Sequence, residues 1–158
     1  MERTKLPTLE EAITTDEALE LAELEKLAER ARQDGIVLHI RQCIHFRKWG
    51  AHRRQVLHPK VGSRLLAMGA VVVAPGETFG AQEGPHHHRL SEDTVFIVEG
   101  EGRFLLGDEW VPIKAGDVVH IPPLVPHCVE NTGSVPLVTI GGQTPIDLDY
   151  QRVVGTWP

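Results

Sequence analysis

Residues 80–100 read GAQEGPHHHRLSEDTVFIVEG, with three consecutive histidines just before a run of β-forming residues. Successive side chains of a strand point to opposite faces, so His86 and His88 share one face and His87 points to the other. The two imidazoles on the shared face are spaced by about 7 Å of backbone, close enough to converge on one ion. A carboxylate after a short turn would add an oxygen ligand. This stretch therefore predicts a metal site at the start of a strand.

A second stretch, residues 116–131, reads GDVVHIPPLVPHCVEN and offers a third imidazole at His127. Three histidines and one carboxylate leave positions for substrate or water on a six-coordinate metal. This ligand set suits iron, manganese, nickel, cobalt or zinc. The sequence thus predicts one divalent transition metal, with iron preferred, held by His86, His88, His127 and a nearby carboxylate.

The first stretch resembles the first signature motif of the cupin superfamily, which comprises small β-barrel proteins with a metal centre in the barrel. That motif has glycine, five residues, His-x-His, three or four residues, glutamate, six residues and glycine. The chain follows this spacing at Gly80, His86, His88, Asp93 and Gly100. The resemblance implies a small single-domain cupin of the metal-binding type.

The second stretch resembles the second cupin motif, which has glycine, five residues, Pro-x-Gly, two residues, histidine, three residues and asparagine. The corresponding positions here are Gly116, Pro122, Leu124, His127 and Asn131. Leu124 stands where the family has glycine, so this turn must avoid a positive φ or tolerate strain. We expect the prolines around the turn to keep the loop stiff enough to deliver His127.

Two neighbouring residues, Asp93 and Glu92, are candidates for the carboxylate ligand. Asp93 has the family's spacing to Gly100 and shares a strand face with Ile97. Glu92 lies on the opposite face with Phe96, unless the turn is one residue shorter. Aspartate is one methylene shorter than the family's glutamate, so a site held by histidines alone is a third alternative. We expect Asp93 to face the metal.

The chain after Gly35 consists of short β-rich runs separated by glycine, proline, asparagine and aspartate. Many short strands spaced by about 8–12 residues are typical of an antiparallel sandwich or barrel. We predict an all-β fold, a cupin-like antiparallel β-barrel (jelly-roll or double-stranded β-helix), over residues 36–158. The expected strands are Ile36–Ile40, Gln55–His58, Ser63–Ala74, Thr94–Glu99, Gly102–Leu106, Glu109–Ile113, Asp117–Ile121 and Val135–Gly141.

An N-terminal extension, residues 1–35, precedes the barrel and is predicted to carry one amphipathic α-helix from Thr14 to Asp34. Thr14 and Glu17 have the spacing of a capping box, and leucines and alanines follow at helical intervals. Gly35 is the predicted stop, because glycine adopts the left-handed conformation that ends helices. We expect this helix to lie across the outside of the barrel or of a partner subunit.

The predicted strand Thr94–Glu99 is apolar on both faces, so its outer face, with Phe96 and Val98, must also be covered. The cover is either the N-terminal extension or a second subunit that packs sheet against sheet. Since the cupin resemblance is compatible with such packing, we expect a homodimer.

Charge is unevenly distributed along this chain, whose net charge is −6. Residues 1–34 carry −5, residues 35–76 carry +7 with no acid at all, and residues 77–158 carry −8. Nucleic-acid-binding domains are normally basic as a whole, so we expect no nucleic-acid partner. The basic segment either neutralises the acidic ones or steers an anionic small molecule through one of its side chains: Arg47, Lys48, Arg53 or Arg54.

The 158 residues are 41% apolar, which is enough for one globular domain with its own core. No apolar run approaches the roughly 20 residues that cross a bilayer, so we expect no membrane association. The N-terminus lacks the apolar stretch of a signal peptide, and two cysteines, Cys43 and Cys128, cannot form a disulfide framework. We therefore expect a cytoplasmic protein.

The other histidines have weaker claims to a role in the site. His120 lies on the strand that leads to Pro122, and we take it as the candidate catalytic residue, pointing into the barrel near the metal. His87 is expected to point outward. Four more histidines do not have the spacing of metal ligands, and we expect them on the surface or at hydrogen-bonded core positions: His39, His45, His52 and His58.

Two kinds of chemistry suit such a metal. It can bind a substrate together with dioxygen, as in non-haem iron oxygenases, or polarise a carbonyl for isomerisation, decarboxylation or elimination. The second kind needs a general base, for which His120 and Glu101 are the candidates. The first needs only ligands and an apolar pocket, whose expected walls are Val95, Ile97, Phe104, Val118 and Leu137.

We therefore favour an iron-dependent dioxygenase that acts on a small anionic or dicarbonyl substrate. A metal-dependent isomerase, decarboxylase or lyase is the first alternative. A non-catalytic cupin that binds a small ligand is the second. A paired helix-turn-helix is absent from residues 1–34, which argues against a free-standing DNA-binding regulator.

Overall fold

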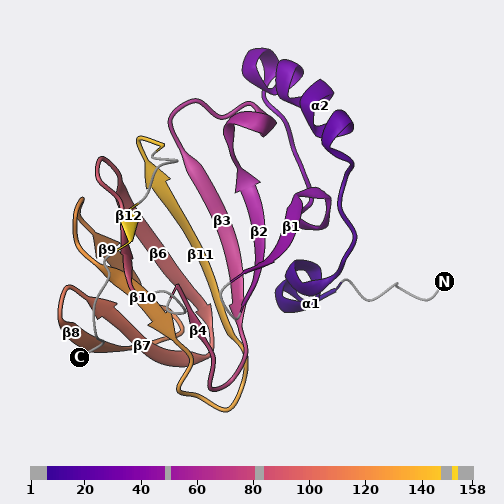
Figure 1. Cartoon of the computed structure of the whole chain (residues 1–158). Coiled ribbons are helices and arrows are strands. Elements are labelled where there is room, and N and C mark those ends of the chain that lie inside the picture. Colours follow the sequence, from indigo (N-terminus) through magenta and orange to yellow (C-terminus); the bar gives the residue numbers. More distant parts are fainter. Residues whose placement is uncertain (1–6, 49–50, 81–83, 147–150, 153–158) are drawn as a thin grey trace.

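The protein folds into two antiparallel β-sheets that face each other, with two helices at one side (Figure 1). The computed structural model describes residues 7–48, 51–80, 84–146 and 151–152. The all-β, cupin-like architecture predicted from the sequence is confirmed.

The first sheet has six strands in the order β1-β2-β3-β11-β6-β9. Their bounds are β1 Ile44–Lys48, β2 Ala51–Leu57, β3 Ala67–Val73, β11 Leu137–Thr144, β6 Glu92–Glu99 and β9 Val118–Ile121. The second sheet has the order β12-β5-β10-β7-β8, and β4 also pairs with β10. Its bounds are β12 Gln151–Arg152, β5 His86–His87, β10 His127–Glu130, β7 Glu101–Leu106, β8 Glu109–Lys114 and β4 Thr78–Phe79.

The main hydrophobic core lies between the two sheets. Its members include residues of both, such as Val73, Ile97 and Leu137 of the first sheet and Phe104 and Val129 of the second. On β3 the alternation is complete, because Val71 and Val73 belong to this core and Ala70 and Val72 face the other side of the sheet. The core therefore holds the two sheets, and the side chains that emerge from them, in fixed relative positions.

Asn131, the last position of the second motif, ties a turn to the first sheet. Its side chain is fully buried, and its amide nitrogen donates to the carbonyls of Val73 and Val135. Its amide oxygen accepts from the N–H of Gly133 at 2.9 Å. The bonds to Val135 and Gly133 shape the turn between β10 and β11, and the bond to Val73 joins that turn to β3. Asn131 therefore supports the barrel and lies outside the site.

One expected strand is wrong. Residues 36–39 form no regular element, and a 3₁₀ turn, η1 (Ile40–Gln42), follows them before β1 begins. The segment connects the N-terminal extension to the sheet, so it has no strand position to fill. The other seven expected strands correspond to β2, β3, β6, β7, β8, β9 and β11, with shifted ends.

The N-terminal extension contains two helices, α1 (Leu9–Thr14) and α2 (Leu21–Asp34), so the prediction of one helix from Thr14 is wrong. The capping box is formed by Thr8 and Glu11, and Thr14 ends α1. The predicted stop is confirmed, because Gly35 follows α2 with a φ of 77°.

The break between the helices has a cause in the barrel. The side chain of Arg54, on β2, donates hydrogen bonds to the backbone carbonyls of Thr15 and Glu17. A carbonyl held by a side chain in this way does not need a helical partner four residues on. The interruption between the two helices is therefore fixed by a residue about 40 positions away in the sequence.

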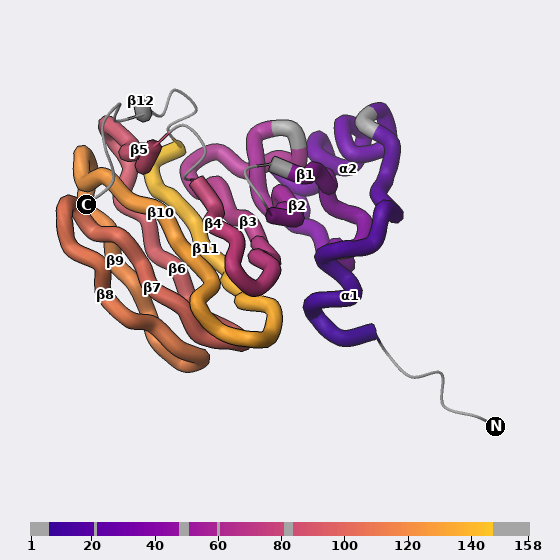
Figure 2. Tube along the Cα trace, turned by 60° about the horizontal axis from the view of Figure 1, so that its bottom comes forward, coloured from indigo at the N-terminus to yellow at the C-terminus, as the bar shows by residue number. Residues whose placement is uncertain are grey.

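Both helices lie on the β1–β2 side of the molecule, away from β7 and β8 (Figure 2). Ile13 of α1 packs on the outer face of the first sheet against Ala70, Val72 and Val138. The extension thus covers part of that face, which is one of the two covers considered for it, while Phe96 stays 45% exposed. Neither α1 nor α2 has the length and apolar character that a membrane crossing requires.

Candidate metal centre

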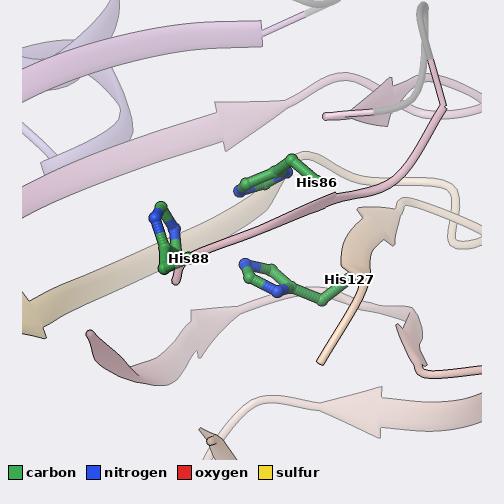
Figure 3. Close-up of side chains that lie close together, drawn as sticks. All are labelled: His86, His88 and His127. Atoms are coloured by element: carbon green, nitrogen blue, oxygen red, sulfur yellow. The ribbon is translucent and has the colours of Figure 1, made fainter. Parts of the chain in front are cut away.

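Three histidines from the two motifs converge inside the barrel (Figure 3). His86 lies on β5, His88 directly follows that strand, and His127 begins β10. The strands β5 and β10 are antiparallel neighbours, with His127 directly opposite His86. One nitrogen from each ring lies within 4.8 Å of the other two. The structure therefore brings together all three histidines that the sequence singled out.

The loop before β10 delivers His127 in one orientation. Leu124 adopts a φ of 68°, and its N–H donates to the carbonyl of His88 at 2.7 Å. Of the two conformations expected for this leucine, the chain adopts the strained one, and the bond to His88 links the two motifs directly. Nδ1 of His127 lies 2.9 Å from the carbonyl of Val125, which only accepts, so Nδ1 carries the proton. Nε2 of His127 is then the nitrogen that presents a lone pair.

Asp93 lies beside the three imidazoles. Its Oδ2 is 3.2 Å from Nε2 of His88 and 3.6 Å from Nε2 of His127. Glu92 is exposed on the other face of β6. This is the face that the alternation of side chains along the strand predicted for it. The structure thus places Asp93, and not Glu92, within reach of the histidines.

The protonation states in this cluster favour a cation. Burial raises the pKa of Asp93, but the neighbouring His127 and His88 outweigh it and bring that pKa to about 2. Burial, together with the neighbouring His127 and His88, lowers the pKa of His86 well below its ordinary value. Near neutral pH the cluster therefore combines an ionised carboxylate with a neutral His86, the form in which imidazole binds metals.

The carboxylate of Asp93 has one oxygen that no described residue binds. Oδ1 of Asp93 is buried and has no hydrogen-bond partner among the residues that the structure describes. Buried polar atoms are normally paired, so an unpaired carboxylate oxygen next to three imidazoles calls for an explanation. Imidazole and carboxylate are ligands of iron, manganese, cobalt, nickel and zinc. The donor set fits a divalent transition metal.

Comparison with known proteins agrees with this architecture. Residues 69–141 match the family described as Cupin domain. An uncharacterized protein of Methanocaldococcus jannaschii is 37% identical over 90 residues, which cover 57% of this chain and 70% of that protein. The chain belongs to the cupin superfamily.

One further relative of this cupin carries a named activity, and one solved structure shares its fold. A 3-hydroxyanthranilate 3,4-dioxygenase of Xanthomonas euvesicatoria is 30% identical over 112 residues, 67% of this chain and 62% of the dioxygenase. The chain thus spans less than two thirds of that enzyme. The solved structure of a predicted oxalate decarboxylase of Thermotoga maritima superposes with a TM-score of 0.61. At 23% identity, over 70% of this chain and all of that one, it shows the shared fold alone.

In this cupin the histidines and Asp93 form part of the wall of a cavity of about 100 Å³ between the sheets. One water needs roughly 10–15 Å³ on this scale, so the cavity holds a small molecule. Two of the expected apolar walls, Val95 and Phe104, line it, together with Val71, Phe79 and Val129. The other three expectations are wrong: Val118 is 62% exposed, while Ile97 and Leu137 are fully buried in the core behind the wall.

The two expected general bases lie outside the cavity. His120 alternates with the buried Val119 and Ile121 on β9, so it points outward and is exposed, contrary to the expectation. Glu101, the first residue of β7, is exposed as well. The expectation that His120 points into the barrel failed because both faces of this strand carry apolar residues, so the sequence did not show which face is inside.

Polar residues from two strands complete the lining: Arg53 of β2, and Thr139 and Gln143 of β11. Arg53 was one of four basic candidates for contact with an anionic molecule. Of the others, Arg54 is fully buried on the opposite face of β2 and Arg47 is exposed. The side chain of Lys48 lies outside the described part of the chain. Gln143 was missed, because only the pairing of β11 with β6 places it opposite Asp93.

Proposed function

We propose that this cupin is an iron-dependent dioxygenase of a small anionic substrate, with the metal held by His86, His88, His127 and Asp93. The observation that carries the proposal is the composition of the cavity wall. Apart from these four residues, no described residue of the wall is an imidazole or a carboxylate. Isomerisation and elimination need a general base beside the substrate, whereas dioxygenation needs none beyond the ligands. The site is therefore best suited to oxygen chemistry.

The thiol of Cys128, which also lines the wall, does not supply a base either. Burial raises the pKa of the Cys128 thiol to about 12, so it stays protonated and unreactive at neutral pH. Cys128 then acts as a small apolar wall residue. With Val71, Phe79 and Phe104 it keeps water away from the reacting atoms.

The roles of the site residues follow from their contacts. An iron held there would supply neighbouring positions for substrate and dioxygen. His127 is oriented by the carbonyl of Val125, which fixes Nε2 toward the centre. Asp93 remains ionised and balances the positive charge of the site. The similarity to the dioxygenase of Xanthomonas euvesicatoria supports the same reaction class.

Oxygen uptake by the iron-loaded protein tests the proposal. The substrates would be a panel of diketones, catechols and thiols, with and without carboxylate groups. We expect substrate-dependent oxygen consumption that disappears in His86→Ala and persists in His120→Ala, whose side chain lies outside the cavity. Turnover without oxygen consumption would replace the dioxygenase with a metal-dependent isomerase, decarboxylase or lyase. Tight binding without any turnover would indicate a ligand-binding cupin.

We also propose that two copies of the chain form a homodimer in the cytoplasm. Phe96 of β6 lies directly opposite Val118 of β9, and the two are 45% and 62% exposed. This apolar pair lies on the face that the extension covers only in part. The two cysteines are free and buried, which suits a reducing compartment. Sedimentation should give a dimer for the wild type and a monomer for Phe96→Lys/Val118→Lys.

A further inference from the structure

Gln143 directs an amide into the cavity close to the candidate metal centre. On β11, Leu137 belongs to the core between the sheets, and Thr139 and Gln143 follow on the same face of the strand. Both of these polar residues line the cavity. The register of the sheet places Gln143 directly opposite Asp93 of β6 and Ala67 of β3. Because opposed side chains point to the same face of a sheet, those of Gln143 and Asp93 leave it about 5 Å apart, into the same cavity.

Among the described residues, no donor reaches the amide oxygen of Gln143, whose Oε1 is buried without a hydrogen-bond partner. The chemistry of its neighbours on the paired strands explains this. The side chain of Ala67 is apolar, Gly141 has none, and the carboxylate of Asp93 accepts. The hydroxyl of Thr139 starts four residues away, which is about 13 Å along the strand.

Two acceptors without donors in the described chain therefore lie beside each other in the wall, Oε1 of Gln143 and Oδ1 of Asp93. Leaving one buried acceptor unpaired costs about 1–3 kcal/mol. A transition metal suits the carboxylate and the imidazoles, whereas a neutral carbonyl oxygen is a ligand that harder cations prefer. A metal at the histidines thus satisfies Asp93, and Gln143 still needs a hydrogen-bond donor.

We propose that Gln143 determines substrate specificity by accepting a hydrogen bond from a hydroxyl or amino group of the substrate. That group lies next to the oxygen atoms with which the same molecule reaches the metal. The substrate class is a small molecule with a hydroxyl or amino group adjacent to its metal-binding oxygens. The place of the group in the molecule rests on the proposed metal site, whereas the hydrogen bond to Gln143 does not.

This contact discriminates because an analogue without the donor leaves Oε1 buried and unpaired. The other role open to the amide is structural. Turned over, it would donate from Nε2 to Oδ1 of Asp93 and would position that carboxylate. Zinc affinity would then depend on Gln143, and the choice between ligands would not. The two roles therefore predict different measurements.

Binding of three catechols to the zinc-loaded full chain tests the contact. Pyrogallol, 3-methylcatechol and 3-methoxycatechol share one pair of metal-binding oxygens, and beside it they carry a hydroxyl, a methyl and a methoxy group. Of these three groups, the hydroxyl alone donates. Calorimetry is run without oxygen, and zinc is used because it has no redox chemistry.

The measured quantity is the ratio of the pyrogallol affinity to the 3-methylcatechol affinity. We expect this ratio to be roughly tenfold higher in the wild type than in Gln143→Met, which is the effect of one hydrogen bond to a buried acceptor. Comparing the two proteins removes the difference that the ligands themselves have toward zinc. 3-Methoxycatechol, whose extra oxygen only accepts, should behave as 3-methylcatechol does.

Gln143→Met keeps the length of the side chain and removes the amide. It should bind zinc as tightly as the wild type, because the amide is not a ligand in this account. Gln33→Met is the matched control, since it makes the same substitution at an exposed position of α2, and it should keep the wild-type ratio. The side-chain N–H signals of Gln143, assigned by their absence from Gln143→Met, should shift with pyrogallol and not with 3-methylcatechol.

Four results would overturn the contact. They are a ratio unchanged in Gln143→Met, a ratio that falls equally in Gln33→Met, a preference that 3-methoxycatechol shares, and a tenfold loss of zinc affinity in Gln143→Met. The last would make Gln143 a metal ligand or a positioning residue for Asp93. A wild type that binds no zinc contradicts the proposed metal site instead. In that case the NMR signals of Gln143 in the metal-free protein, titrated with pyrogallol and 3-methylcatechol, still decide the contact.

Discussion

Arg53 and Arg54 are neighbours in the sequence with the same charge, yet they serve opposite faces of the first sheet. Arg54 is fully buried on the outer face, where it donates to backbone carbonyls of the N-terminal extension and of the segment before β1. Arg53 lies on the inner face, in a slot between two phenyl rings at the wall of the cavity.

On the outer face the polar groups bind other parts of the chain and stabilise the fold. On the inner face some polar atoms have no partner in the described chain and are available to a ligand. On the outer face the acceptors of Arg54 are carbonyls of the chain itself, from Ile13 to Cys43. On the inner face Oδ1 of Asp93 and Oε1 of Gln143 are buried without partners in the described part of the chain. Since leaving such atoms unpaired costs stability, their presence together around one cavity indicates a binding function.

The largest expected effect is on the outer face. Arg54→Leu removes the donor for several carbonyls, and each buried one left unpaired costs about 1–3 kcal/mol. We expect the free energy of unfolding to fall by about 4 kcal/mol, measured by urea denaturation. Arg53→Gln, the matched change on the inner face, should cost less than about 1 kcal/mol. If Arg53→Gln destabilised the protein as much as Arg54→Leu, the distinction between the two faces would fail.

Metal binding is expected to have the next largest effect. A metal at 100 times its dissociation constant should raise the free energy of unfolding by about 2.7 kcal/mol, because it binds only the folded chain. The metal-free protein should still unfold cooperatively, since its core lies between the sheets and contains none of the three histidines. Thermal melts with zinc or with chelator check both points. A chelated sample without a cooperative transition would contradict this account.

The carboxylate should have a smaller effect than the histidines together. Asp93→Ala should weaken zinc binding about tenfold, or about 1.4 kcal/mol, because it removes the oxygen beside His88 and His127. Glu92→Ala is the matched control on the exposed face and should behave as the wild type. Asp93→Glu should be tolerated or improved, since it restores the residue of the cupin motif. Equal zinc affinity in both alanine variants would show that the histidines alone bind the metal, without a carboxylate ligand.

The smallest expected effect concerns the loop that carries His127. Leu124→Gly removes the strain of a left-handed conformation, which costs roughly 1–2 kcal/mol for a residue with a Cβ. Glycine also raises the conformational entropy of the unfolded chain, which offsets part of this gain. Leu124 is 60% exposed, so few contacts are lost. We expect a gain in stability of less than about 1 kcal/mol, and no gain in Leu124→Ala, which keeps the strain. A loss of stability in the glycine variant would show that the leucine itself holds the loop.

Local patterns in the sequence predicted much of the site. The spacing of the two motifs located His86, His88 and His127, and the alternation of β6 placed Asp93 on their side and Glu92 on the other. These inferences need only the period of a strand and the order of residues. They depend on no contact between distant segments except the pairing that the cupin motifs imply.

The features that the sequence did not predict depend on distant contacts. The break between α1 and α2 follows from Arg54, and the position of Gln143 follows from the register between β11 and β6. His120 was expected inside because its strand is apolar on both faces, and only the packed sheet shows which face is outward. Register and packing come from the whole chain, so a local reading could not supply them.

The central claim is that His86, His88 and His127 hold a metal ion, and metal analysis of the purified full chain tests it most directly. The wild type and the variant His45→Ala/His52→Ala, whose two histidines stack on each other outside the cavity wall, should bind about one transition metal per chain. The variant His86→Ala/His127→Ala should bind none under the same loading. Full metal occupancy in that variant, with the fold intact, would contradict the account.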